Sequence, residues 1–452
     1  MYHLKNCSNL FVRFTFVIFA GFIIGALETP AVAKSGNFSV NPGTSETAAA
    51  VTVLDGGGAE WRAFAWKIQN GRQDELLTSQ SATATTAPLT FHLPPVQQDT
   101  FVEMGLTTGT DSTSPMAFAW RTLDRPEGKH LADYTGQKSL LPPADFDEYW
   151  TRAVHQLDEV TSNPKITRVP DQDTSTGLLY RVELGSVEST TIVGWLYVPR
   201  AAYAGGDPGG AVVGQFPAIM LIPGYGGDQH PVDRTAQGLI TFSLNPRNHG
   251  PSRAFWKSPV EHLVYNITSP ENYFYKLAAL DCLQGARFLF SRREVDPGRI
   301  GAEGSSQGGY LALATAALEP RIRCVAAMVI AFSDYPDGLE LATHGGMTQL
   351  RDLLADENSS PTLIRKSLAY TDGANLATRV KASVLITVGA LDPTAPYLCG
   401  IVTAARLPAK TTRQIQVDAD ARHEVTGRMR RWVAEWEQRW LKPESPPEAP
   451  LQ

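Results

Sequence analysis

The sequence contains little cysteine. Four cysteines stand among 452 residues, at positions 7, 282, 324 and 399. Their wide and uneven spacing excludes the disulfide framework of a small secreted scaffold, and the lack of a Cys-x-x-Cys pair argues against a structural zinc site. Because Cys7 lies in a segment that we predict to be removed, at most one disulfide is expected in the mature chain.

The sequence also lacks a strong charge of either sign. It has 40 Lys and Arg against 46 Asp and Glu, a formal net charge of −6, and only 19% charged residues. No run of Lys or Arg exceeds a few residues, so the electrostatic footprint of a protein that binds nucleic acid is missing. The hydrophobic content of 43% instead predicts a globular protein with a sizeable core, divided into two or three domains.

The apolar run near the N-terminus is too short for a membrane span. It extends from Phe14 to Leu27, whereas roughly 20 residues are needed to cross a bilayer. Lys5 and Arg13 precede or border this run, and Ala31-Val32-Ala33 offers a cleavage site of small residues. We therefore predict that residues 1–33 are a signal peptide, that cleavage occurs near Ala33, and that the mature protein is secreted or periplasmic with no stable membrane anchor. An uncleaved anchor is the alternative.

Residues 34–125 are built of short β-type runs separated by turn-rich stretches, and they show no helical period. This spacing predicts a small β-sandwich-like domain. A packing or spacer role is favoured for it, with carbohydrate binding as the alternative. Residues 126–143 are predicted to be a linker. The β-type runs lie at 49–54, 61–68, 88–93, 101–106 and 116–123.

After the linker, β-type and helical segments alternate. The alternation predicts an α/β fold over residues 144–441, with a mostly parallel sheet, helices on both faces and the catalytic groups at the carboxyl ends of the strands. Asp145 and Glu148 predict a capping box at the start of the first helix. Residues 442–452 are predicted to be a disordered tail. Strands are expected at 191–198, 216–222, 238–244, 299–303, 324–331 and 384–388, and helices at 271–293, 307–318 and 425–441.

One motif carries the chemistry. Gly304-Ser305-Ser306-Gln307-Gly308 fits the pattern Gly-x-Ser-x-Gly, which is a weak signal by itself. Here a strand is expected directly before it and a helix directly after it, which is the context that a nucleophile elbow requires. The glycines let the strand and the helix approach closely while the serine hydroxyl points outward. Ser306 is therefore the predicted nucleophile.

A serine hydroxyl needs a base to take its proton, and the base needs a carboxylate that holds its tautomer. In this architecture the chain order is Ser, then Asp or Glu, then His. Asp392 follows the strand expected at 384–388, and His423 is the one histidine beyond it. We predict Asp392 and His423 as the acid and the base, with Asp334 and Asp372 as rival acids.

The oxyanion of the reaction needs two backbone N–H donors. Gln307 N–H is one of them by construction of the elbow. The second is expected in the glycine-rich loop after an early strand, where Pro223-Gly224-Tyr225-Gly226-Gly227 stands, and Tyr225 is the predicted donor. An ordinary glycine-rich turn is the alternative for that loop.

At this point the residues resemble a known family, the acetyl xylan esterases and cephalosporin-C deacetylases of carbohydrate esterase family seven, within the α/β-hydrolase superfamily. The resemblance covers about residues 141–441 and leaves the β region outside. It implies an α/β-hydrolase fold, Ser306, Asp392 and His423 as the catalytic triad, and Tyr225 and Gln307 as oxyanion donors. The ordered motifs are ADFDEYW at 144–150, GWLYVP at 194–199, GYGG at 224–227, VDPGRIG at 295–301, GSSQGG at 304–309, SLAYTDGANLA at 367–377, GALDPTAP at 389–396 and HE at 423–424.

One motif departs from the family. Where the family typically carries Arg-Gly-Gln-Gly after an early strand, this chain has Arg247-Asn248-His249-Gly250. In the family this element braces the site, so the change leaves the nucleophile intact and bears on the pocket and on acyl preference. Arg247 and His249 are candidate pocket residues, and a structural loop histidine is the favoured interpretation of His249.

These observations predict an exported serine esterase that hydrolyses short acyl esters, above all acetyl, on xylan, xylo-oligosaccharides or related carbohydrates. No metal and no organic cofactor is expected. Two alternatives stay open: a prolyl-oligopeptidase-like serine peptidase or another carboxylesterase, and an inactive hydrolase-fold protein that binds glycans. The β region is too short for a propeller, which weakens the peptidase alternative. The natural ester and the oligomeric state, including a homo-oligomer, are left open by the sequence.

Overall fold

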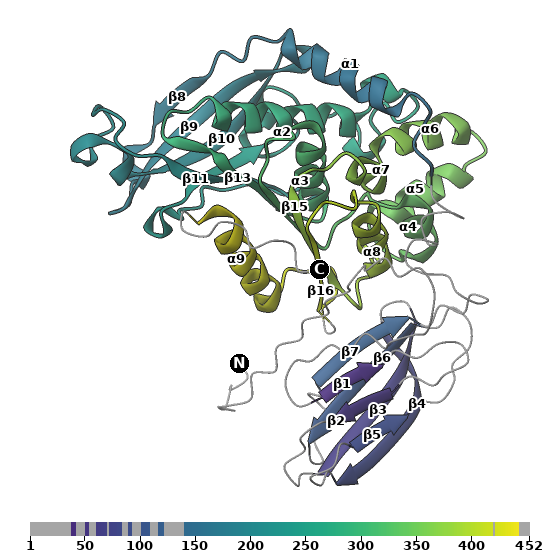
Figure 1. The fold of residues 1–452 in the computed structure, drawn as a ribbon. Coiled ribbons are helices and arrows are strands. Elements are labelled where there is room, and N and C mark those ends of the chain that lie inside the picture. The colour runs from purple at the N-terminus through teal and green to yellow at the C-terminus, as the bar shows by residue number, and fades with distance from the viewer. Residues whose placement is uncertain are drawn as a thin grey trace. The chain divides into compact units, whose positions relative to one another are not determined.

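The computed structural model describes most of the chain beyond residue 140 and the strands that precede it (Figure 1). The predicted signal peptide, residues 126–139 of the predicted linker and the predicted tail beyond residue 442 lie outside the described residues. The chain divides into two units, Met1–Gly128 and Lys129–Gln452. The described ranges are 38–41, 50–53, 60–69, 72–83, 89–92, 101–108, 116–121, 140–418 and 421–442.

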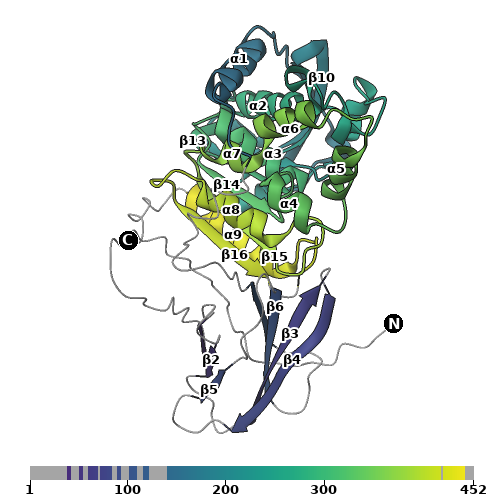
Figure 2. The same cartoon turned by 90° about the vertical axis from the view of Figure 1, so that its right-hand side faces the viewer.

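The described part of the first unit consists of two antiparallel sheets, which Figure 2 shows as separate layers. One sheet has the order β1-β2-β5 and the other β4-β3-β6-β7. The Gln80 side chain on β4 donates to the His92 carbonyl of β5 and so links the two sheets. The strands are β1 (Phe38–Asn41), β2 (Ala50–Val53), β3 (Glu60–Gln69), β4 (Arg72–Thr83), β5 (Leu89–His92), β6 (Phe101–Thr108) and β7 (Met116–Arg121).

The second unit is built on one nine-stranded sheet. Its strand order is β16-β15-β14-β13-β11-β12-β10-β9-β8, and all pairs from β12 to β16 are parallel, while β8, β9 and β10 pair antiparallel. The mostly parallel sheet predicted from the sequence is confirmed. The strands are β8 (Lys165–Arg168), β9 (Gly177–Ser186), β10 (Thr190–Pro199), β11 (Phe216–Ile222), β12 (Ile240–Asn245), β13 (Val295–Ser305), β14 (Cys324–Met328), β15 (Ser383–Gly389) and β16 (Arg413–Asp418).

Helices cover both faces of this sheet (Figures 1 and 2). Three antiparallel-paired strands, β8, β9 and β10, at one end of an otherwise parallel sheet, with helices on both faces, give the α/β-hydrolase architecture. The helices are α1 (Phe146–Asp158), α2 (Phe274–Phe290), α3 (Gln307–Leu318), α4 (Tyr335–Leu341), α5 (Gly346–Ala355), α6 (Pro361–Thr371), α7 (Gly373–Ala377), α8 (Tyr397–Ala405) and α9 (Gly427–Leu441).

The second unit has a hydrophobic core on each face of its sheet, because side chains alternate between the two faces along the central strands. On β11, Met220 and Ile222 join the cluster under α2 and α3, whereas Ile219 and Leu221 join the cluster under α9. Successive strand side chains point to opposite faces, so a strand that is apolar throughout fits a sheet covered on both sides. Packing on both faces therefore fixes β11, whose carboxyl end leads into the loop that carries Tyr225.

The predicted capping box at the start of α1 is wrong. Asp145 precedes the helix, but its side chain makes no capping hydrogen bond. Its carboxylate instead accepts a hydrogen bond from the Tyr370 hydroxyl of α6, 2.5 Å away, and lies 3.6 Å from Arg152. A hydrogen bond to a residue distant in the sequence thus replaces the capping hydrogen bond that the local spacing predicts.

Candidate active site

Ser306 sits at a strained turn between β13 and α3. Its backbone has φ 55° and ψ −122°, a conformation that side-chain-bearing residues rarely adopt. The turn is possible because both flanking glycines are in close backbone contact. A Cβ on Gly304 would lie 2.3 Å from the Gly308 carbonyl carbon, and a Cβ on Gly308 would lie 2.3 Å from the Ile222 carbonyl oxygen. The motif therefore builds the elbow that its pattern predicts.

The structure brings Ser306, His423 and Asp392 together in a hydrogen-bonded row. The His423 Nε2 atom lies 2.9 Å from the Ser306 Oγ atom, and the His423 Nδ1 atom lies 2.8 Å from the Asp392 Oδ2 atom. Since the carboxylate can only accept, Nδ1 carries the proton and Nε2 is free to accept the serine proton. His423 follows β16 on a loop and keeps a quarter of its side chain exposed, while the Asp392 side chain is fully buried.

Local backbone holds the acid in place. The second oxygen of Asp392, Oδ1, accepts the N–H groups of Thr394 and Ala395, each at 2.8 Å. Asp392 lies just after β15, so the end of a buried strand and the following turn fix both carboxylate oxygens. Both carboxylate oxygens of Asp392 therefore have hydrogen-bond partners within the protein.

The two rival acids lie elsewhere. Asp334 precedes α4, and burial together with the nearby carboxylates of Asp337 and Asp372 raises its pKa to about 9. Asp372 caps α7 and accepts the backbone N–H groups of Asp334, Tyr335 and Ala374. Neither carboxylate makes a hydrogen bond to His423.

The two predicted oxyanion donors are available. Gln307 is the first residue of α3, and Tyr225 lies in the loop after β11. Among the described residues, neither backbone N–H donates to a carbonyl, so both remain free to bind a ligand. Gly224 in the same loop lies against the elbow, where its Cβ would be 3.4 Å from the Ser305 carbonyl oxygen. The loop and the nucleophile are therefore neighbours.

Arg247 and His249 lie behind this site with fully buried side chains. The Arg247 guanidinium forms a buried ion pair with Asp281, with Nε 2.8 Å from Oδ2, and also binds the Glu188 carboxylate at 2.9 Å. His249 contacts the Gln307 side chain and the Arg247 carbonyl. Full burial keeps both side chains away from an incoming ester, which corrects their assignment as candidate pocket residues and agrees with the favoured interpretation of His249 as a structural loop histidine.

Sequence reasoning missed His262, which lies in a 3₁₀ turn (His262–Val264) after the Arg-Asn-His-Gly loop. Its ring stacks on Tyr225, with centroids 4.1 Å apart, and its Nε2 atom lies 3.1 Å from the Gln307 Oε1 atom. The adjacent Glu261 accepts a hydrogen bond from the Tyr225 hydroxyl, and burial together with this carboxylate raises the pKa of Tyr225 well above its usual value. No local pattern marks His262, because its partners come from three separate segments.

The described residues contain no group of three or more His, Cys, Asp or Glu side chains that could hold a metal ion. None of the helices in the described part of the chain has the length and apolar character of a membrane span. Cys282, Cys324 and Cys399 are buried free thiols.

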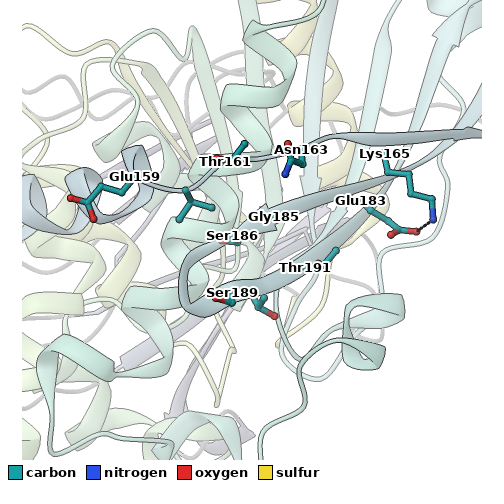
Figure 3. A pocket seen from close by; sticks show the side chains of 11 residues that line it. Glu159, Thr161, Asn163, Lys165, Glu183, Gly185, Ser186, Ser189 and Thr191 are labelled. Carbon is teal, nitrogen blue, oxygen red and sulfur yellow. Dashed lines mark ion pairs between the residues drawn. The ribbon is translucent and has the colours of Figure 1, made fainter.

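A separate hollow of about 560 Å³ lies where the end of α1 meets strands β8, β9 and β10 (Figure 3). None of the predicted site residues lines it. Its rim carries an ion pair between Lys165 and Glu183 at 3.5 Å, and the Thr190 hydroxyl is buried there without a hydrogen-bond partner among the described residues. Ser186 at its edge binds Asp281, the partner of Arg247.

Comparison with known proteins agrees with this geometry. The sequence model of the family described as acetyl xylan esterase (AXE1) matches residues 124–441. The chain belongs to the acetyl xylan esterase family. The family match covers the whole of the nine-stranded sheet and leaves out the two antiparallel sheets that precede it, as the resemblance in the sequence implies.

Individual relatives are distant in sequence, and their descriptions agree with the family match. The acetyl esterase Axe7A of Xylanibacter ruminicola is 24% identical over an alignment of 285 residues. The alignment covers 58% of this chain, and the chain spans only 61% of that protein's length. Acetyl xylan esterase 1 from Thermoanaerobacterium sp. JW/SL YS485 superposes with a TM-score of 0.60, and the acetyl xylan esterase from Paenibacillus sp. R4 with 0.62. Both are 24% identical and align over 69% of this chain and 98% of their own. These superpositions confirm the α/β-hydrolase fold.

Proposed function

We propose that this protein is a serine esterase that removes acetyl groups from carbohydrates. The observation that carries the proposal is the row of Ser306, His423 and Asp392, with hydrogen bonds of 2.9 and 2.8 Å at a strained elbow. Family membership adds the reaction class, since the family is named for acetyl xylan esterases. Acetylated xylan and xylo-oligosaccharides are the proposed substrates.

The geometry supports a two-step reaction. The His423 Nε2 atom takes the Ser306 proton while Oγ attacks the ester carbonyl, and the negative oxygen that forms is bound by the Tyr225 and Gln307 N–H groups. His423 then gives this proton to the departing sugar oxygen as the ester bond breaks, so that the sugar leaves with a free hydroxyl. A water molecule repeats the sequence on the acetyl-Ser306 ester and releases acetic acid, which restores the free serine.

Acetyl is the proposed acyl group because the family is described as acetyl xylan esterases and because Tyr225 packs into an aromatic cluster. Tyr225 lies 6.1 Å from the ring of Phe332, and Phe332 lies 4.7 Å from the ring of Tyr275, between ring centroids. Overfilling a packed site by one or two methylenes costs roughly 1 to 3 kcal/mol. At about 1.4 kcal/mol per tenfold change, a butyryl ester should lose one to two orders of magnitude in kcat/KM against acetyl.

The test measures kcat/KM for acetyl, butyryl and octanoyl esters of one chromogenic alcohol, together with acetate release from acetylated xylan and acetylated xylo-oligosaccharides. We expect acetyl to be fastest and the carbohydrates to release acetate. Octanoyl turnover equal to acetyl turnover would point to a lipase-like carboxylesterase, and cleavage of peptides instead of esters would point to a peptidase.

We also propose that the protein is exported. The support is the sequence of residues 1–33, where a charged segment, an apolar run and Ala31-Val32-Ala33 follow one another. Fractionation of cells that express the full chain, with N-terminal sequencing of the product, tests this proposal. A mature protein that starts near Lys34 outside the cytoplasm is expected, and an unprocessed chain in the cytoplasm would contradict it.

A further inference from the structure

The Gln307 side chain is buried, and both its amide oxygen and its amide nitrogen lie within hydrogen-bond distance of neighbouring side chains. Its Oε1 atom accepts the Tyr275 hydroxyl at 3.0 Å and faces the His262 Nε2 atom at 3.1 Å. Its Nε2 atom faces the His249 Nε2 atom at 2.9 Å. The amide of the proposed oxyanion residue is therefore clamped between two histidine rings.

The partners of each ring determine where its proton lies. The His249 Nδ1 atom is 2.9 Å from the Arg247 carbonyl oxygen, which can only accept, so Nδ1 carries the proton and Nε2 accepts from the Gln307 amide. The His262 ring has the opposite tautomer, with its proton on Nε2. Its Nε2 atom donates to Gln307 Oε1, and its Nδ1 atom accepts from the Asn248 amide at 3.1 Å.

Asn248 is held in the orientation that this arrangement needs. Its side-chain oxygen accepts the Ser258 backbone N–H at 3.0 Å, which leaves its amide nitrogen to face His262. Its backbone lies at φ 65°, in the left-handed region that asparagine tolerates better than most residues. Asn248 and His249, the two residues that depart from the family motif, thus serve one hydrogen-bond network with His262.

Both rings must be neutral for the clamp to form, since a second ring proton would place two donors against each other. Burial lowers the pKa of His249 to about 4 and lowers that of His262. Arg253 and the other histidine of the pair also disfavour a charge on His249, while Asp228 and the Arg247 carbonyl favour it. Glu261 and Gln307 favour a charge on His262, and Arg253 disfavours it.

His262 connects the clamp to the second donor. Its ring stacks on Tyr225, and the neighbouring Glu261 binds the Tyr225 hydroxyl. The two residues whose N–H groups face the proposed oxyanion therefore share one support. A shift of His262 would displace Tyr225 and Gln307 together.

We propose that His249 and His262 are positioning residues that hold Gln307 and Tyr225 in the geometry that binds the oxyanion. This inference rests on the proposed esterase function. Neither histidine contacts the ester. They act through the orientation of two neighbouring peptide groups, whose N–H vectors must point at the oxygen that becomes negative in the transition state.

The first experiment compares substitutions at residue 249 in the full-length mature protein. In His249→Gln the new amide offers an oxygen to Gln307 and an N–H to the Arg247 carbonyl, so the clamp is kept. His249→Leu has neither and leaves the Gln307 amide unpaired. With p-nitrophenyl acetate we expect kcat of His249→Leu to fall about 10- to 100-fold with KM within about threefold, and His249→Gln to stay within about threefold of wild type.

A matched control separates positioning from a general loss of stability. Gln284→Leu removes another buried amide, which donates to the Gly185 carbonyl at 2.7 Å and does not touch the clamp. It should lower Tm while kcat stays near that of the wild type. If His249→Leu and Gln284→Leu lose kcat equally, or if His249→Gln loses as much as His249→Leu, the proposal is wrong.

His262→Phe tests the connection to Tyr225. Phenylalanine keeps a ring against Tyr225 and removes both ring nitrogens, so the stacking is kept while the hydrogen bonds to Gln307 and Asn248 are lost. We expect a fall in kcat with KM nearly unchanged, and a matching loss of affinity for a boronic acid that mimics the oxyanion. Unchanged boronic-acid affinity in a folded variant would overturn the role assigned to His262.

The second experiment does not depend on esterase activity. Nitrogen NMR of the ¹⁵N-histidine-labelled protein at pH 7.5 should show His249 protonated on Nδ1 and His262 protonated on Nε2, with assignments from the single variants. The opposite forms, or a charged ring, would refute the clamp. If the forms are as expected while the wild type hydrolyses no ester, the proposed function fails and the arrangement of the clamp stands.

Discussion

At the scale of single residues, surroundings rather than residue type separate the proposed catalytic acid from its rivals. Asp392 and Asp334 both follow central strands of one sheet. Asp392 accepts hydrogen bonds from two backbone amides and faces His423, as a carboxylate requires. Asp334 faces other carboxylates in a buried setting that raises its pKa to about 9, so it keeps a proton at neutral pH.

This difference predicts opposite results for two matched variants. Asp392→Asn should lower kcat by about 10³- to 10⁴-fold, because an amide at this position favours the wrong tautomer of His423. Asp334→Asn replaces a carboxyl that is already protonated with a neutral group of the same shape, and its kcat should stay within about threefold of wild type. Steady-state kinetics on one acetyl ester measures both, and the reverse ranking would move the acid to Asp334.

The buried His249 predicts a loss of stability in acid. Its pKa in the folded protein is about 4, below the usual 6.5, so between these values the unfolded chain binds a proton that the folded chain does not. Stability should therefore fall as pH drops from about 7 towards 4, by about 2 to 3 kcal/mol from this group. Below about pH 4 the contribution no longer changes.

His249→Gln lacks this titration. Urea unfolding at pH 7.5 and pH 4.5 should give the wild type a decrease in unfolding free energy at least about 2 kcal/mol larger than that of His249→Gln. Equal decreases in the two proteins would show that His249 is not a buried neutral histidine.

At the scale of elements, the elbow depends on contact between β11, β13 and α3. The contact has no room for a methyl group at Gly308, because the Ile222 and Pro223 carbonyl oxygens would lie 2.3 and 3.0 Å from it. Both are backbone atoms and cannot rotate away. The approach of helix to strand therefore sets where the Ser306 hydroxyl stands relative to His423.

Gly308→Ala should push α3 away from β11. We expect unfolding free energy to fall by about 2 kcal/mol or more and kcat by at least about 100-fold. Gly427→Ala is the matched control, because Gly427 also opens a helix and has no atom within 4 Å of its would-be Cβ. It should change stability by less than about 0.5 kcal/mol, or raise it slightly. Similar behaviour of the two variants would contradict the role of the close contact.

The elements differed in how far they could be predicted. The apolar run 216–222 coincides with β11, and the helix expected at 307–318 coincides with α3, because buried central elements carry continuous hydrophobic signals. β4 was missed because Arg72–Thr83 is largely polar. Helices α4–α8 were missed because they are short and packed by distant partners, and propensity is weak in such segments.

The residues of the candidate site likewise differ in how far the sequence predicts them. Ser306, Asp392 and His423 could be proposed from chain order and from strand ends, since the fold relates these positions in a regular way. His262 could not, because its role comes from contacts with residues 225, 248 and 307, which only the folded chain brings together. The buried state of Arg247 likewise depends on Glu188 and Asp281, from other segments.

At the scale of the whole molecule, the division into two units separates the chemistry from the antiparallel sheets. Every residue assigned to the site lies beyond residue 220, and the family match begins at residue 124. Two solved relatives align over 98% of their own length on 69% of this chain, which shows that a fold of this kind exists without an added β domain.

A truncated protein that begins at Gln137 should therefore remain folded and hydrolyse a small acetyl ester at a rate close to that of the mature protein. Its secondary structure is checked by circular dichroism and its kcat/KM by the same chromogenic ester. A soluble, folded truncation without activity would mean that the N-terminal unit contributes to the site or to an assembly that the site needs.

The most direct measurement of the central claim is the turnover of an acetyl ester by Ser306→Ala, beside wild type of equal Tm. The change removes one oxygen atom at an elbow whose backbone is held by Gly304 and Gly308, so the fold should persist. Turnover should fall by several orders of magnitude, as losses of about 10⁶ in kcat for a catalytic serine illustrate. A variant that keeps a tenth of the wild-type rate would show that Ser306 is not the nucleophile.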